Sequence, residues 1–98
     1  MRAMEQATTS IDSDIPGYWT ETQGLKIHYR RAGRGEPFVL IHGGGNDWHE
    51  WQENLGPLSR TFEVYAPDFP GFGLSDSPAV PVSPAFLRTF LKEFLEFT

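Results

Sequence analysis

The sequence predicts an α/β fold in which an antiparallel hairpin leads into a parallel β-α-β unit and then into an amphipathic C-terminal helix. Three patterns carry this prediction. Residues 25–30 alternate between apolar and polar side chains, the apolar run 38–41 passes directly into a glycine-rich turn, and residues 86–95 show helical spacing. The order strand, turn, helix, strand over residues 38–66 implies a parallel crossover connection.

The chain divides into a short polar segment and one domain. Residues 1–16 lack periodicity and are rich in Thr, Ser and Asp, so we expect a flexible N-terminal tail. Residues 17–98 form the domain. Its first two strand-forming segments, 18–22 and 25–30, flank Gln23-Gly24, and this arrangement predicts a β-hairpin.

One face of the hairpin is polar. Lys26 and Arg30 share this face with His28, because alternate side chains of a strand point to the same side. We expect the face to be solvated, and an anion-binding patch is the alternative.

A parallel pair of strands follows the hairpin. Residues 38–41 are apolar on both faces, which is typical of a central strand covered by helices on both sides. Residues 62–66 predict the second strand of the pair. A parallel pair needs a crossover between its strands, most often a helix.

Helical spacing of the apolar residues over 48–58 predicts that helix. Asn46 or Asp47 is expected to cap its N-terminus. Pro57 is expected to kink or split it near Gly56, because proline lacks the backbone N–H that continues a helix.

The C-terminal helix has the strongest pattern in the chain. Ser83 is the expected N-cap and Pro84 the first helical residue. The apolar side chains of this helix form one broad stripe, made of Phe86, Leu87, Phe90, Leu91, Phe94 and Leu95. We expect the stripe to face the core, and a partner-binding helix is the alternative.

Composition bounds the possible functions. The 98 residues suffice for one small domain, and 39% hydrophobic with 21% charged residues is typical of a globular chain. The net charge of −5 argues against nucleic-acid binding through phosphate neutralisation. Cysteine is absent, which excludes disulfides and thiolate metal sites. No membrane span or signal peptide is expected, and the default location is cytoplasmic.

The most informative segment for chemistry is His42-Gly43-Gly44-Gly45. Consecutive glycines after a buried strand let the backbone approach a ligand closely and turn N–H groups toward it. With a helix N-terminus behind it, such a turn suits a phosphate or a developing oxyanion.

A nucleotide-binding module is therefore one alternative. The dinucleotide fingerprint G-x-G-x-x-G/A is followed by an acidic residue about 20 positions further on. Gly43 and Gly45 match the first two glycines and Asp68 matches the acidic residue, but Trp48 occupies the third glycine position. A Walker-type phosphate loop is excluded, because the chain has no Gly-Lys-Ser/Thr.

No metal site is expected. Asp47, His49 and Glu50 lie on one short helical turn, but the H-E-x-x-H spacing of zinc enzymes is absent. His42 is expected to hydrogen-bond the glycine turn rather than to bind a metal.

Residues 68–75, Asp-Phe-Pro-Gly-Phe-Gly-Leu-Ser, complete a pair of motifs with residues 41–45, Ile-His-Gly-Gly-Gly. Together they resemble the N-terminal part of the α/β-hydrolase family, in the branch with an HG-type oxyanion turn and a D-x-P-G-x-G-x-S loop. The resemblance covers residues 17–98. It implies a largely structural role for the 68–75 loop beside the active site.

The resemblance also implies roles for residues of the turn. The backbone N–H of Gly44 is the expected oxyanion-hole donor, because the family uses the N–H just after the His-Gly pair. Gly43 and Gly45 shape the turn. With Asn46 and Trp48, which border it, they are the candidate substrate-binding residues.

The family's nucleophile, acid and His base come later than the part that this chain resembles. We therefore expect an N-terminal fragment of a hydrolase that is inactive alone, with no catalytic residue of its own; Ser75 is not expected to be a nucleophile. The longer parent would hydrolyse an ester, epoxide, halide or carbon–carbon bond of a small molecule, without an organic cofactor.

A non-catalytic small protein that pairs with another chain is the remaining alternative. In the family sheet the strand at 38–41 has neighbours on both sides, and one of them is not in this chain. An unpaired apolar edge favours strand addition. We therefore expect self-association, or pairing with another chain through this edge or the C-terminal helix.

Overall fold

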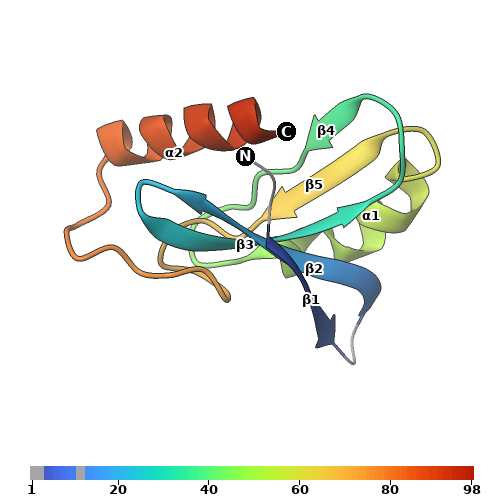
Figure 1. Ribbon diagram of the computed structural model, residues 1–98, viewed down its shortest axis with the longest axis horizontal. Helices are drawn as coiled ribbons and strands as arrows, with labels where there is room; N and C mark the ends of the chain where they lie inside the picture. Colours follow the sequence, from blue (N-terminus) through green and yellow to red (C-terminus); the bar gives the residue numbers. More distant parts are fainter. Residues whose placement is uncertain (1–3, 11–12) are drawn as a thin grey trace.

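Five strands form one mixed sheet in the computed structural model, which describes residues 4–10 and 13–98. In chain order the strands are β1 (Met4–Ser10), β2 (Ser13–Thr22), β3 (Leu25–Ala32), β4 (Pro37–Val39) and β5 (Glu63–Pro67). Their spatial order is β1-β2-β3-β5-β4, and every neighbouring pair is antiparallel except β4 and β5, which are parallel (Figure 1). The predicted α/β class, with a hairpin followed by a parallel unit, is confirmed.

The structure differs from the prediction near the N-terminus. Residues 1–16 were expected to form a tail, but β1 lies within this segment and β2 begins at Ser13. The two strands pair antiparallel through their backbones, with Thr8 opposite Gly17. Strands pair through backbone groups, which every residue type carries. A Thr- and Ser-rich strand therefore need not show apolar alternation, and hydrophobic periodicity does not detect β1.

The predicted hairpin is confirmed as the β2–β3 pair. Its register runs from Gly17 opposite Arg30 to Thr22 opposite Leu25. The two central residues of the turn have φ values of 52° at Gln23 and 78° at Gly24. Positive φ at both positions is the geometry of a type I′ turn, whose twist matches that of the flanking strands.

The crossover between β4 and β5 contains a 3-10 turn, η1 (Trp48–Trp51), and a short helix, α1 (Gln52–Leu58). Asp47 caps η1, as predicted, by accepting a hydrogen bond from the His49 N–H at 2.9 Å. The helix is not split near Gly56, so that part of the prediction is wrong. The helix runs through Gly56 and Pro57 and ends at Leu58, one residue after the proline.

The C-terminal helix α2 (Pro84–Phe97) begins as the sequence predicts. The Ser83 hydroxyl accepts a hydrogen bond from the Phe86 N–H at 3.1 Å, and Pro84 is the first helical residue. Phe90 and Phe94 are fully buried against the sheet, whereas Leu95 is 53% exposed. The core-facing stripe is therefore confirmed for its central residues and does not extend to Leu95.

Helices cover both faces of the sheet. Successive side chains of β5 point to opposite faces, so they enter two different cores. Tyr65 belongs to the core under α2, whereas its neighbours Val64 and Ala66 belong to the core under η1 and α1. The other buried members of these two clusters are Ile27, Tyr29, Phe90 and Phe94 on the α2 side, and Leu40, Trp48 and Leu55 on the η1 side. The result is a three-layer arrangement (Figure 1).

Strand β4 lies at one edge of the sheet. It pairs with β5, and the Leu40 N–H just after it donates to the Tyr65 carbonyl at 2.8 Å. No other strand among the described residues pairs with β4. Within the same described residues, no helix is both long and apolar enough to cross a membrane.

The open edge of β4 leads to a prediction for the isolated chain. We expect the 98-residue chain to self-associate or to be only marginally folded, because an apolar edge strand offers unpaired N–H and C=O groups to a second strand. Analytical ultracentrifugation over a concentration series measures this directly. A monomer that unfolds in a sharp two-state transition at micromolar concentration would contradict the prediction.

Tyr65 leads to a second prediction, for alkaline pH. Burial raises the pKa of the Tyr65 phenol above its ordinary value, and its 2.9 Å hydrogen bond to Glu63 acts in the same direction. A raised pKa means that this contribution to stability is present below about pH 10 and is lost as the pH rises further. Urea unfolding at several pH values should show that the free energy of unfolding falls more steeply above pH 10 in the unmodified chain than in Tyr65→Phe. Equal slopes would contradict the prediction.

Candidate functional site

The glycine turn follows β4 and is held at three points around Gly43. The Gly43 N–H donates to the Glu50 carboxylate at 2.8 Å. The Gly43 carbonyl accepts from the Asn46 N–H at 3.3 Å and bonds the Nδ1 atom of His42 at 2.7 Å. Gly45 has a φ of 80°, which is the geometry of the third residue of a type II turn.

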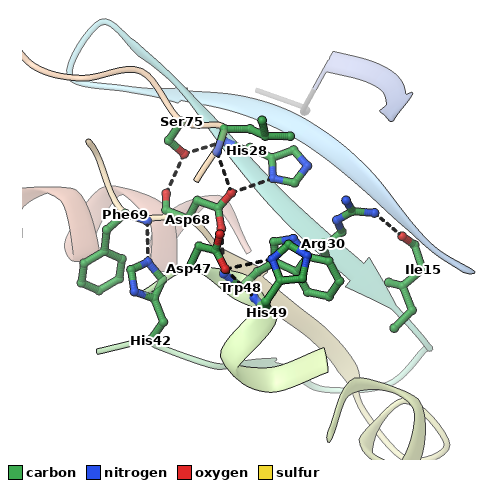
Figure 2. A network of polar contacts seen from close by, with 11 residues as sticks. Ile15, His28, Arg30, His42, Asp47, Trp48, His49, Asp68, Phe69 and Ser75 are labelled. Carbon is green, nitrogen blue, oxygen red and sulfur yellow. Dashed lines mark hydrogen bonds and ion pairs between the residues drawn. The ribbon is translucent and has the colours of Figure 1, made fainter. Parts of the chain in front are cut away.

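His42 connects this turn to the neighbouring loop. Its ring is buried, and its Nε2 atom accepts a hydrogen bond from the Phe69 N–H at 2.9 Å (Figure 2). A backbone N–H only donates, so the hydrogen-bond network assigns the proton to Nδ1, which donates to the Gly43 carbonyl. The predicted role of His42 in bonding the turn is confirmed.

Gly44 presents an open donor in the turn. It is exposed, and no residue in the described part of the chain accepts a hydrogen bond from its N–H. The preceding N–H, that of Gly43, is already bonded by Glu50. Sequence reasoning identified Gly44, but it did not predict that Glu50 accepts a hydrogen bond from the neighbouring Gly43 N–H.

The Asp68 carboxylate lies at the centre of a buried polar network. Its Oδ1 atom accepts from the Trp48 N–H at 2.8 Å. Its Oδ2 atom lies 2.9 Å from Nδ1 of His28 and accepts from the Leu74 N–H at 3.1 Å. Asp68 is fully buried and joins β3, the start of η1 and its own loop (Figure 2).

The loop after Asp68 is tied back to the same strand. The Ser75 hydroxyl donates to the Asp68 carbonyl at 2.6 Å and accepts from the His28 N–H at 2.9 Å. The His28 ring bonds the Asp68 carboxylate instead of the hydroxyl, so neither of these hydrogen bonds of Ser75 within the described residues is to a side-chain base. Gly73 has a φ of 53°, and a Cβ there would collide with the Asp68 carboxylate.

The prediction of a solvated polar face on the hairpin is wrong for two of its three residues. Lys26 is exposed, but His28 is fully buried and Arg30 is only 3% exposed. The Arg30 guanidinium lies 4.4 Å from the Trp48 ring centroid and donates to the Ile15 carbonyl at 2.7 Å. Alternation identified the face correctly but could not reveal that η1 and the Asp68 loop cover it.

Trp48 and Asn46 border the turn in different ways. The Trp48 side chain is 2% exposed and packs in the core under η1, which counts against its predicted contact with substrate. Asn46 is exposed, and its side-chain oxygen accepts from the Asp47 N–H at 2.9 Å.

The geometry disfavours the nucleotide-binding alternative. In the fingerprint, the acidic residue binds a ribose hydroxyl and the glycine N–H groups face the pyrophosphate. Here Asp68 is buried and bonded to protein groups, and the Gly43 N–H is bonded to a carboxylate. Neither group is available to a nucleotide.

The residues weighed as metal ligands are engaged with each other and with the turn. Nδ1 of His49 lies 2.9 Å from the Asp47 carboxylate, and Glu50 bonds Gly43. In the part of the chain that the structure describes, no group of three His, Asp or Glu side chains is arranged to hold a metal ion.

The chain belongs to the α/β-hydrolase fold family. The family model matches residues 36–97, which is more than half of the chain and includes both motifs described above. The parallel unit, the glycine turn and the Asp68 loop all lie within the matched residues.

Three relatives illustrate the similarity. The chain is 32% identical over 85 residues to a soluble epoxide hydrolase of Corynebacterium sp. strain C12, covering 87% of this chain and 30% of the relative. It is 35% identical over 81 residues to the acetyltransferase component of the acetoin cleaving system of Cupriavidus necator, covering 82% and 22%. The solved epoxide hydrolase CorEH has a TM-score of 0.79 and 32% identity, covering 85% of this chain and 29% of that one. The chain thus spans about three tenths of the length of the two epoxide hydrolases and about a fifth of the length of the acetyltransferase component.

The Asp68 network leads to a stability prediction. Replacing Asp68 with Ala removes the acceptor that the buried His28 ring, the Trp48 N–H and the Leu74 N–H share, which should cost about 3–5 kcal/mol or prevent cooperative unfolding. Asp68→Asn keeps one acceptor oxygen and should cost less. Urea unfolding measures both, with Glu53→Ala on the exposed side of α1 as the control. An Asp68→Ala midpoint equal to that of the control would contradict the prediction.

Proposed function

We propose that this chain is the N-terminal part of a hydrolase, and that it supplies the oxyanion-hole donor of the active site. The observation that carries the proposal is the open N–H of Gly44, which directly follows a residue whose own N–H and C=O are both bonded. Membership of the α/β-hydrolase family supports it. The parent hydrolase cleaves an ester, epoxide, halide or carbon–carbon bond of a small molecule.

The chemistry at the turn is electrostatic. As a nucleophile attacks, negative charge develops on a substrate oxygen, and a fixed N–H donor stabilises that charge without rearranging. Gly44 provides the donor, while Gly43 and Gly45 shape the turn so that the substrate can approach the backbone. Asn46 borders the same surface.

The remaining catalytic groups lie outside this chain under the proposal. Ser75 is bonded to Asp68 and His28, and the rings of His28 and His42 are engaged with protein groups. We therefore infer that the 98-residue chain is inactive by itself. We also propose that it is part of a longer protein that functions in the cytoplasm and needs no organic cofactor.

Epoxides are the first substrates to test. Two of the relatives reported above are epoxide hydrolases, which supports this choice. The acetyltransferase relative is a reason to assay esters in parallel.

The first measurement is the mass of the native protein in its source cells, detected with an antibody against this chain. A species near 30 kDa, the size of an ordinary single-domain enzyme, supports the proposal. It should hydrolyse an epoxide or an ester. A native species of 11.1 kDa would overturn it.

The second candidate function, a non-catalytic chain that pairs through a strand edge, is favoured by the open edge of β4. It predicts the 11.1 kDa species together with a bound partner. The purified 98-residue chain separates the two ideas further. Ester turnover that disappears in Ser75→Ala would contradict both.

The donor role of Gly44 leads to a mutational prediction in the longer hydrolase. Gly44→Pro removes the N–H and should lower kcat by about 10²–10³-fold. Gly44→Ala keeps the N–H and meets no atom within 4 Å, so it should lower kcat less than about tenfold. Steady-state kinetics measures both, and equal losses in the two variants would contradict the prediction.

A further inference from the structure

We propose that Glu50 is a positioning residue for the oxyanion turn, a role that rests on the proposed function. Its carboxylate fixes the Gly43 N–H and so helps to keep the next N–H, that of Gly44, directed away from the protein.

The argument begins with the peptide group between Gly43 and Gly44. A trans peptide is planar, and its C=O and N–H point in opposite directions. The C=O of this peptide belongs to Gly43 and is held by the Nδ1 atom of His42 and the N–H of Asn46. The N–H of Gly44 must therefore point the other way, where no described residue accepts it.

His42 and Asn46 fix only one side of Gly43. A glycine samples φ values on both sides of zero with little cost, so its other side needs a restraint as well. Glu50 provides that restraint through the 2.8 Å bond to the Gly43 N–H. With both polar groups of Gly43 bonded, neither adjoining peptide can rotate without breaking a hydrogen bond.

Local structure fixes Glu50 in turn. It lies in η1, where its own N–H donates to the Asp47 carbonyl at 3.1 Å. The Trp48 N–H at the start of η1 is held by Asp68. A carboxylate accepting from an N–H forms a charge-assisted hydrogen bond, which is stronger than a bond between neutral groups. The Glu50 side chain therefore reaches Gly43 from an anchored element.

The bond also determines which of two neighbouring N–H groups, those of Gly43 and Gly44, a substrate oxygen can use. Gly43 and Gly44 are neighbours in an exposed glycine turn, and without Glu50 both N–H groups would be open to solvent. Glu50 occupies the first and leaves the second. The structure thus assigns Glu50 a role in selecting the donor, acting through Gly43 and without contact to substrate.

The first test uses the longer protein that contains this chain and does not depend on hydrolase activity. Solvent exchange of the Gly43 amide proton, measured by NMR, should be at least about tenfold faster in Glu50→Ala, which corresponds to the loss of one charge-assisted hydrogen bond. Glu50→Gln keeps an acceptor oxygen, and its Gly43 exchange rate should stay within about threefold of that of the unmodified protein. Glu53→Ala, on the exposed side of α1, is the matched control and should not change the exchange rate.

The second test uses the longer hydrolase. Glu50→Ala should lower kcat about tenfold with KM changed less than about threefold, and Glu50→Gln should restore most of the loss. Unchanged Gly43 exchange in Glu50→Ala would overturn the proposal, and so would an unchanged kcat in an active hydrolase. A longer protein without hydrolase activity would overturn the proposed function instead, while faster Gly43 exchange would still support the contact.

Discussion

The arrangement of this chain depends on one buried carboxylate. Asp68 follows β5 directly, and its two oxygens bond the first residue of η1, the ring of His28 on β3 and the backbone of its own loop. These segments are distant in sequence, and the chain has no disulfide to join them. A buried charge is tolerated only when such bonds surround it, so the carboxylate makes the relative placement of these segments specific.

The same carboxylate reaches the glycine turn through the neighbouring residue. Phe69 follows Asp68, and its N–H donates to the ring of His42, whose other nitrogen bonds the Gly43 carbonyl. The direction of the Gly44 N–H is therefore coupled to the position of the Asp68 loop. The two motifs that the sequence analysis paired, 41–45 and 68–75, are thus physically connected: the second helps to hold the glycines of the first in place.

Local patterns were sufficient to predict much of the fold. Gln23-Gly24 predicted the turn of the hairpin and Ser83-Pro84 the start of α2, because in each case the residues themselves impose the backbone geometry. Contacts between distant segments were not predictable in this way. The burial of His28 and Arg30 depends on η1 and the Asp68 loop covering β3, and alternation within one strand contains no information on what covers it. Backbone pairing likewise placed β1 where no apolar pattern existed.

The glycines of the candidate site show the same difference between local features, which the sequence predicts, and contacts with other segments, which it does not. Three consecutive glycines predict that a backbone N–H can approach a ligand, but their freedom leaves the direction of each N–H undetermined. In the structure that direction comes from side chains on either side of the glycines: His42 bonds the Gly43 carbonyl, and Glu50 bonds its N–H. Catalytic stabilisation of an oxyanion requires donors that are already oriented before charge develops. The glycines therefore supply access, and the polar side chains that bond them supply the orientation.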